Sequence, residues 1–195
     1  FGEVVASVRG ERTLVDGEKM PGATWYPDAR LNFAENLLRR RDDELAIVFR
    51  GEDQVELRMT WAQLYELVAG LVQALKARGV QAGDRVGGYL PNMPQTIAAM
   101  LATVSVGATW SSCSPDFGVQ GVVDRFGQIE PKVMICVDGY YYNGKVIDSL
   151  DKVRDIQAAV PSIGHIIVVP YTRDTPSLDG LRNAVMLGDA VAVGE

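Results

Sequence analysis

Residues with direct catalytic, metal-binding or disulfide chemistry are scarce in this sequence. It has one histidine, His165, and two widely separated cysteines, Cys113 and Cys136. A single histidine excludes a histidine-rich metal site, and two distant cysteines make neither a disulfide framework nor a zinc-binding spacing. Both cysteines stand in apolar stretches, which is typical of small buried residues in a cytoplasmic protein. His165 directly precedes an apolar run and is expected to mark the start of a strand.

The sequence also lacks a dense basic region and a long apolar run. The formal net charge is -6, and the one basic run, Arg39–Arg41, is followed at once by the acidic run Asp42–Glu44. Nucleic acids and anionic membranes select basic surfaces, so we expect neither as a partner. The longest apolar stretch, Ile97–Trp110, is too short to span a bilayer. Because the chain begins at Phe1 rather than methionine, we expect the natural amino terminus to lie upstream, and targeting is weakly constrained.

An alternation of strands and helices is what the sequence does contain. Short strands are predicted near residues 85–90 and 109–112, a β-branched strand at 133–137 and an apolar strand at 166–169. Helical stripes lie between these segments, near residues 94–106, 118–129 and 146–156. Such alternation requires crossover connections, so we predict an α/β fold with a mostly parallel sheet flanked by helices.

The segments before and after this alternation set the expected domain boundaries. Residues 1–30 have no clear period and predict an extended arm with turns. The α/β portion is expected to span residues 31–170. Residues 171–195 predict a linker or the start of a further element, with one weak element near residues 184–191.

Local signals in the first half of the α/β portion predict three elements. Asn32, with Glu35 three positions later, predicts a short helix that runs to about Arg41. Residues 45–60 predict a hairpin. Thr60 and Gln63 then form a capping box that opens a long helix, which ends at Gly79.

A glycine-bounded segment after the expected strand 133–137 has the spacing of a phosphate-binding loop. Gly139 and Gly144-Lys145 match GxxxxGK, and a helix start at this point would offer free N–H groups and a favourable dipole to an anion. However, Val146 stands where such a loop needs Ser or Thr to hold magnesium, and the loop interior is bulky. The pattern leaves two interpretations open: Lys145 contacts an anion, or it is a plain lysine at a helix start.

Two further segments join a strand to a helix. In open α/β sheets, ligands collect at the carboxyl ends of the strands, and residues 111–118 follow such an end. Ser114 and Asp116 either cap the next helix or face a ligand. Residues 90–94 read as a structural turn, because prolines and an asparagine suffice for it. Serine elbows, paired catalytic carboxylates and zinc spacings are absent from the sequence, so no catalytic residue is assigned.

Several segments resemble the adenylate-forming acyl-CoA synthetases of the AMP-binding superfamily. The general resemblance is carried by Leu31–Asn36, Thr60-Trp61, Gly83–Val86, Leu90–Pro94 and Ser105–Ser111. Narrower stretches resemble the acetoacetate-activating branch: Trp110–Val119, Asp124–Lys132 and Asp138–Lys145. The resemblance covers nearly the whole chain from Leu14 to Pro170.

The resemblance implies an ATP-dependent acid–thiol ligase that makes acetoacetyl-CoA from acetoacetate, ATP and CoA through an acyl-adenylate. ATP, Mg²⁺ and CoA are expected with the full-length enzyme, and none is expected on the chain alone. The family's phosphate loop and its catalytic lysine have no counterpart in this sequence. We therefore expect an inactive amino-terminal segment whose truncation-exposed surface favours self-association. The alternatives are a segment of an acetyl- or propionyl-CoA synthetase, a self-contained nucleotide-binding enzyme that uses residues 139–145, and a non-catalytic α/β interaction module.

The resemblance also implies which residues of this chain contact CoA. The segment Ser114–Phe117 aligns with a stretch that lines the CoA nucleotide. Asp138–Lys145 aligns with a loop that carries two arginines near the CoA phosphate in acetyl-CoA synthetases; Lys145 keeps one of these charges and Tyr142 replaces the other. The expected CoA-binding residues are therefore Ser114, Asp116, Phe117, Tyr142 and Lys145, with no catalytic residue and no metal site.

Overall fold

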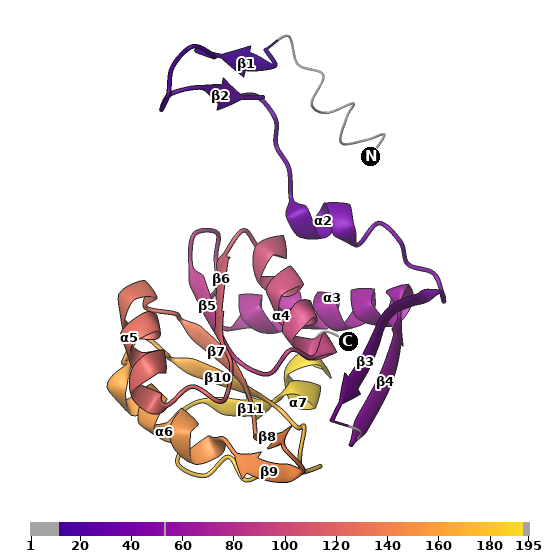
Figure 1. The fold of residues 1–195 in the computed structure, drawn as a ribbon, viewed down its shortest axis with the longest axis vertical. Helices are drawn as coiled ribbons and strands as arrows, with labels where there is room; N and C mark the ends of the chain where they lie inside the picture. The colour runs from indigo at the N-terminus through magenta and orange to yellow at the C-terminus, as the bar shows by residue number, and fades with distance from the viewer. Residues whose placement is uncertain (1–11, 53, 193–195) are drawn as a thin grey trace.

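The computed structural model describes residues 12–52 and 54–192. Its central feature is a five-stranded sheet in the order β11-β10-β7-β5-β6, in which every neighbouring pair is parallel (Figure 1). The strands are β5 (Arg85–Tyr89), β6 (Thr109–Cys113), β7 (Val133–Val137), β10 (His165–Val169) and β11 (Ala184–Met186). The prediction of one parallel sheet from the alternating pattern is confirmed, and His165 begins a strand as expected.

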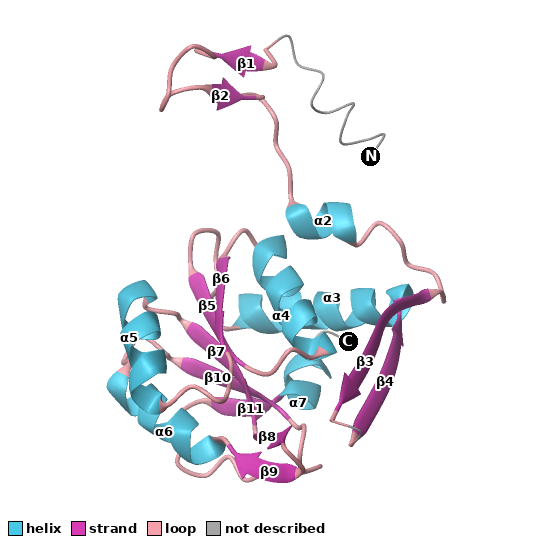
Figure 2. Ribbon diagram, in the orientation of Figure 1, coloured by secondary structure: helices cyan, strands magenta, loops and turns pink. Residues whose placement is uncertain are grey.

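Each face of this sheet is covered by its own helices, because successive residues of a strand point to opposite faces. Val133, Ile135 and Val137 pack into one apolar cluster, and Met134 and Cys136 pack into the other. The first cluster contains α3 (Trp61–Ala77), α4 (Pro94–Ser105) and α7 (Leu187–Ala192). The second contains α5 (Val119–Ile129) and α6 (Leu150–Ala159). Figure 2 shows the two groups of helices on opposite sides of the sheet.

The amino-terminal part lies outside this sheet. A short hairpin of β1 (Leu14–Val15) and β2 (Thr24–Trp25) stands away from the body (Figure 1). After it come α2 (Phe33–Leu37) and the antiparallel pair β3 (Leu45–Gly51) and β4 (Val55–Thr60).

Local signals in this part had mixed outcomes. The hairpin over residues 45–60 and the Thr60–Gln63 capping box are confirmed. Asn32 caps α2, but the helix ends at Leu37 rather than near Arg41. It stops there because Leu38 is drawn into the core and the chain turns toward β3.

The carboxyl-terminal segment, for which we expected a linker or a further element, adds to the same sheet domain. β11 pairs with Ile166, Ile167 and Val168 of β10, and α7 packs against α3. The weak element expected near residues 184–191 is therefore a strand followed by a short helix. Every helix among the described residues falls short of the length and apolar character that a membrane span requires.

Candidate functional site

The loop between β6 and α5 lies at the carboxyl end of β6. Phe117 donates its backbone N–H to the Ser114 carbonyl at 3.1 Å, which closes a turn with Pro115 at its second position. Pro115 is buried, whereas Ser114 and Asp116 are exposed and Phe117 is 38% exposed. Gly118 is the N-cap of α5, and no side chain caps this helix. The interpretation of Ser114 and Asp116 as helix caps is therefore wrong, and their side chains face outward.

Two donors from other elements hold the backbone of this loop. The hydroxyl of Tyr89 lies 2.8 Å from the carbonyl oxygens of both Pro115 and Phe117. The ammonium of Lys152, on α6, donates to the Pro115 carbonyl at 3.2 Å. The guanidinium of Arg125 stacks 4.5 Å from the centre of the Phe117 ring. The backbone of the loop is therefore held by Tyr89 and Lys152, while the side chains of Ser114, Asp116 and Phe117 stay exposed to solvent.

The segment after β7 is a hairpin, and the expectation of a loop that leads into a helix is wrong. β8 (Gly139–Tyr142) pairs with β9 (Lys145–Asp148), and α6 begins only at Leu150. Asn143 and Gly144 have φ of 50° and 69°, as a two-residue hairpin turn requires, and Asn-Gly is the strongest sequence signal for such a turn. The hairpin excludes a phosphate-binding loop of the Walker type.

The register of the hairpin decides which side chains share a face. Tyr140 lies opposite Ile147 and Tyr142 lies opposite Lys145, so these four side chains point to one side. Burial raises the pKa of Tyr140, and the nearby Asp116 carboxylate raises it further. Tyr140 is only 9% exposed, and the Lys152 ammonium lies 6.0 Å from the centre of its ring. Tyr142 and Lys145 therefore share the hairpin face of Tyr140, whose ring lies beside Lys152 of α6.

The electrostatic setting of Lys145 differs from the one we expected. Lys145 is exposed on β9 and not at a helix start, so no helix dipole assists it. Instead, the N–H groups of Asn143 and Gly144 point outward at the hairpin tip. They donate to the carboxylate of Glu52, in the β3–β4 turn, at 3.1 and 3.3 Å. Backbone N–H groups arranged in this way attract negative charge.

The family model for AMP-binding enzymes matches residues 33–184. The chain belongs to this family of AMP-binding enzymes. The acetoacetyl-coenzyme A synthetase of Rhizobium meliloti (strain 1021) is 56% identical over 185 residues, which cover 94% of this chain and 28% of that protein. The acetoacetyl-CoA synthetase of Gallus gallus is 42% identical over 88% of this chain and 26% of its own length. The solved acetoacetyl-CoA synthetase from Streptomyces lividans matches with a TM-score of 0.84 at 43% identity, covering 93% of this chain and 28% of that one.

The chain thus spans 26–28% of the length of these relatives. The family resemblance seen in the sequence is confirmed. Among the described residues, no group of three His, Cys, Asp or Glu gathers that could hold a metal ion.

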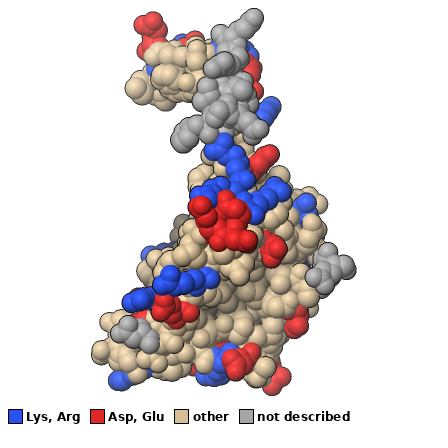
Figure 3. Space-filling view, turned by 90° about the vertical axis from the view of Figure 1, so that its right-hand side faces the viewer, with Lys and Arg blue, Asp and Glu red and all other residues tan. Residues whose placement is uncertain are grey.

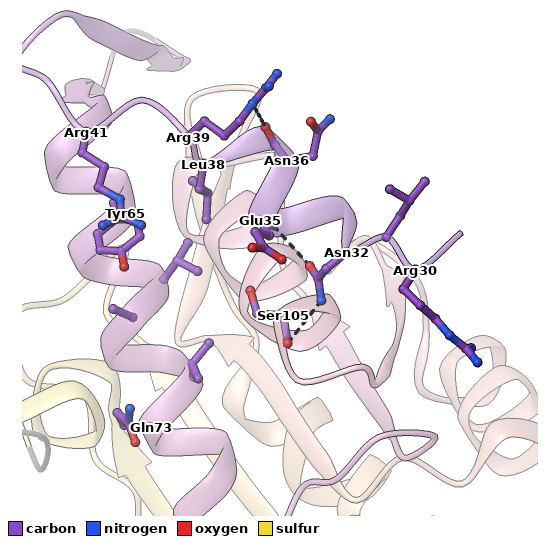
Figure 4. Close-up of a pocket in the computed structure, with 14 residues that line it drawn as sticks. Arg30, Asn32, Glu35, Asn36, Leu38, Arg39, Arg41, Tyr65, Gln73 and Ser105 are labelled. Carbon is purple, nitrogen blue, oxygen red and sulfur yellow. Dashed lines mark hydrogen bonds between the residues drawn. The ribbon is translucent and has the colours of Figure 1, made fainter. Parts of the chain in front are cut away.

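A groove lies in another part of the molecule. It has a volume of about 860 Å³ and opens between α2, α3 and the end of α4. Figure 4 shows Arg41 over the Tyr65 ring, 3.9 Å from its centre, and the Asn32 amide directed at the carbonyl of Ser105. Ser105 precedes β6, so this groove faces the amino end of that strand. None of the five predicted site residues lines it.

The face that carries the β3–β4 hairpin has no single sign of charge. Figure 3 shows Lys and Arg interleaved with Asp and Glu there. Arg40 pairs with Asp42 and Glu44, and Arg58 pairs with Glu56. This mixed face agrees with the cancelling charge runs Arg39–Arg41 and Asp42–Glu44 in the sequence.

Sequence reasoning missed three residues of the candidate site: Tyr89, Arg125 and Lys152. Each reaches the loop from a different element, and Tyr89 stands in an apolar strand where it reads as core. Neither spacing nor periodicity distinguishes them from ordinary core or surface residues. The one usable signal was the Asn-Gly pair, which predicts the hairpin and hence the common face of Tyr142 and Lys145.

Proposed function

We propose that this chain supplies the amino-terminal part of an ATP-dependent ligase that makes acetoacetyl-CoA from acetoacetate, ATP and CoA. In the first step, the acetoacetate carboxylate attacks ATP and forms an acyl-adenylate and pyrophosphate. In the second step, the CoA thiol displaces AMP, which is a far better leaving group than hydroxide. The family match supports adenylate chemistry, and 56% identity over 94% of this chain supports acetoacetate as the acid.

The role of this chain in the proposed reaction is to bind and orient CoA. Lys145, an exposed cation on β9, would attract a CoA phosphate. Phe117 and Tyr142 offer exposed aromatic surfaces for the nucleotide base, and Ser114 and Asp116 offer polar groups beside them. The observation that supports this proposal is that Lys152 lies beside the Tyr140 ring, on the hairpin face of Tyr142 and Lys145, and also donates to the Pro115 carbonyl of the 114–118 loop.

ATP and Mg²⁺ enter the proposal as requirements of the full-length enzyme, and no step is assigned to them on this chain. A cytoplasmic location is part of the same proposal; both cysteines are free and buried, which supports a reducing compartment. Self-association also stays a prediction. It is supported by large apolar side chains that the arm leaves exposed, with Met20 at 96% and Trp25 at 65%.

The function is tested by comparing acids in the full-length enzyme and by assaying the chain alone. We expect acetoacetate-dependent ATP–pyrophosphate exchange, and formation of the acyl-CoA thioester when CoA is added. A higher kcat/KM for acetate or propionate would contradict acetoacetate and favour the acetyl- or propionyl-CoA alternative. We expect the 195-residue chain alone to release no pyrophosphate, and release that is lost on denaturation would contradict this.

A further inference from the structure

Tyr89 occupies an unusual place for a core residue. It is the last residue of β5, which pairs with both β6 and β7, and it is 0% exposed. Its ring packs in the apolar cluster beneath α5 and α6. Its hydroxyl points out of this cluster toward the 114–118 loop and lies 2.8 Å from the carbonyl oxygens of Pro115 and Phe117.

The hydroxyl has one proton, which it donates in turn to, or shares between, the carbonyl oxygens of Pro115 and Phe117. The Pro115 carbonyl also accepts from Lys152, which uses both of its lone pairs. Asp116 stands between the two carbonyls that Tyr89 holds. The backbone on both sides of Asp116 is therefore held by Tyr89, a residue that does not reach the surface.

We infer that Tyr89 is a positioning residue for the loop that we assign to CoA, and that it acts on the thioester-forming step through this loop. The kinetic part of the inference rests on the proposed function. The contact of Tyr89 with the loop backbone is independent of that function. In the described part of the chain, Tyr89 and Lys152 are the two side chains that hydrogen-bond to the backbone of residues 114–118. Burial also raises the pKa of Tyr89, so the phenol stays protonated and remains a donor at neutral pH.

The kinetic test is Tyr89→Phe in the full-length enzyme, because phenylalanine keeps the ring and removes only the hydroxyl. We expect the apparent KM for CoA to rise about 5- to 20-fold, while acetoacetate-dependent ATP–pyrophosphate exchange stays within about twofold of wild type. Tyr65→Phe is the matched control, since Tyr65 lies on α3 beneath Arg41 and away from the loop. An unchanged KM for CoA, or an equal fall in both half-reactions, would overturn the inference.

A second measurement is independent of CoA. Amide hydrogen exchange of residues 116–118 in the chain should become faster in Tyr89→Phe and stay unchanged in Tyr65→Phe. Unchanged exchange at the loop would overturn the inference whatever the ligand is. If Tyr89→Phe unfolds, Lys152→Met removes the second donor from a partly exposed helix position, and the same two shifts are expected at smaller size. If the full-length enzyme forms no acyl-CoA, the proposed function fails, and the exchange result still decides whether Tyr89 orders the loop.

Discussion

The carboxylate of Asp138 accepts a 2.5 Å hydrogen bond from the hydroxyl of Thr172, which joins the end of β7 to the segment after β10. The other oxygen of Asp138 accepts the backbone N–H groups of Tyr171 and Thr172 at 2.6 and 3.1 Å. Asp138 is fully buried and immediately precedes β8. The base of the hairpin that carries Tyr142 and Lys145 is therefore fixed by one satisfied buried carboxylate.

Replacing Asp138 should destabilise the fold. Asp138→Ala leaves three partly buried donors, on Tyr171 and Thr172, without their partner, and we expect the free energy of unfolding to fall by about 2–4 kcal/mol. Urea denaturation measures the loss. Asp155→Ala, at an exposed position of α6, is the control and should change stability by less than about 0.5 kcal/mol. Similar losses in the two variants would show that the Asp138 network contributes nothing specific.

Gly139 should not tolerate a side chain. A Cβ there would lie 2.7 Å from the Ile147 carbonyl oxygen and 2.7 Å from the Thr172 hydroxyl, so the hairpin must shift. We expect Gly139→Ala to lower the free energy of unfolding by about 1–3 kcal/mol. Gly127→Ala, in α5 where a Cβ meets nothing within 4 Å, should instead raise it by about 0.5–1 kcal/mol. Thermal melting of the pair checks the opposite signs.

Substitution with alanine should lower the free energy of unfolding at Thr60, which caps a helix, but not at Ser114, which does not. Thr60 accepts the N–H of Gln63 at 3.2 Å in a complete capping box, so Thr60→Ala should cost about 1 kcal/mol of unfolding free energy. Ser114 caps no helix, so Ser114→Ala should change it by less than about 0.5 kcal/mol. A loss from Ser114→Ala as large as that from Thr60→Ala, in urea titrations, would restore the capping interpretation.

Asp84 should contribute to the loss of stability in acid. The Gln81 N–H, followed by the Lys132 ammonium at 3.0 Å, lowers the pKa of Asp84 in the folded state. Because the pKa of Asp84 is lower in the folded state than in the unfolded state, the ionised carboxylate stabilises the fold above the unfolded-state pKa of about 4. This stabilisation is lost as the pH falls through the folded-state pKa. Below about pH 4, Asp84→Asn should therefore lose less unfolding free energy than the wild type. The difference should be less than about 1 kcal/mol, because the pair with Lys132 is partly exposed. An Asp84→Asn profile that matches the wild-type profile would contradict the assignment.

Lys145 should affect CoA binding modestly in the full-length enzyme. Because it is exposed and has no helix dipole behind it, we expect Lys145→Ala to raise the apparent KM for CoA by about 2- to 10-fold. High salt should narrow the difference from wild type, since an exposed charge is screened. Lys76→Ala, on α3, is the control. A slower ATP–pyrophosphate exchange with an unchanged KM for CoA would assign Lys145 to the first step or to structure.

Much of the fold was predictable because its signals are local. The β-branched run Val133–Val137 is apolar at every position, as a strand buried on both faces requires, and it lies at the centre of the sheet. The stripe from Trp61 to Ala77 and its capping box also needed no distant partner. Other elements depended on distant contacts. The three residues of β11 become a strand only by pairing with β10, and α2 ends where Leu38 enters the core.

In the candidate site, too, some features follow from the local sequence and others from tertiary contacts. The sequence alone determined that the candidate residues belong to two segments, each of which follows a strand of one parallel sheet: Ser114, Asp116 and Phe117 in one, Tyr142 and Lys145 in the other. This was possible because each strand is predictable from the residue pattern of its own segment. The tertiary structure decided which way these residues face, because a side chain's direction in a hairpin depends on its pairing register. It also decided what holds them, since Tyr89 meets the loop across 26 positions of the chain and Lys152 across 37. Such contacts follow from the packing of β5 and α6 around the sheet, which no local pattern specifies.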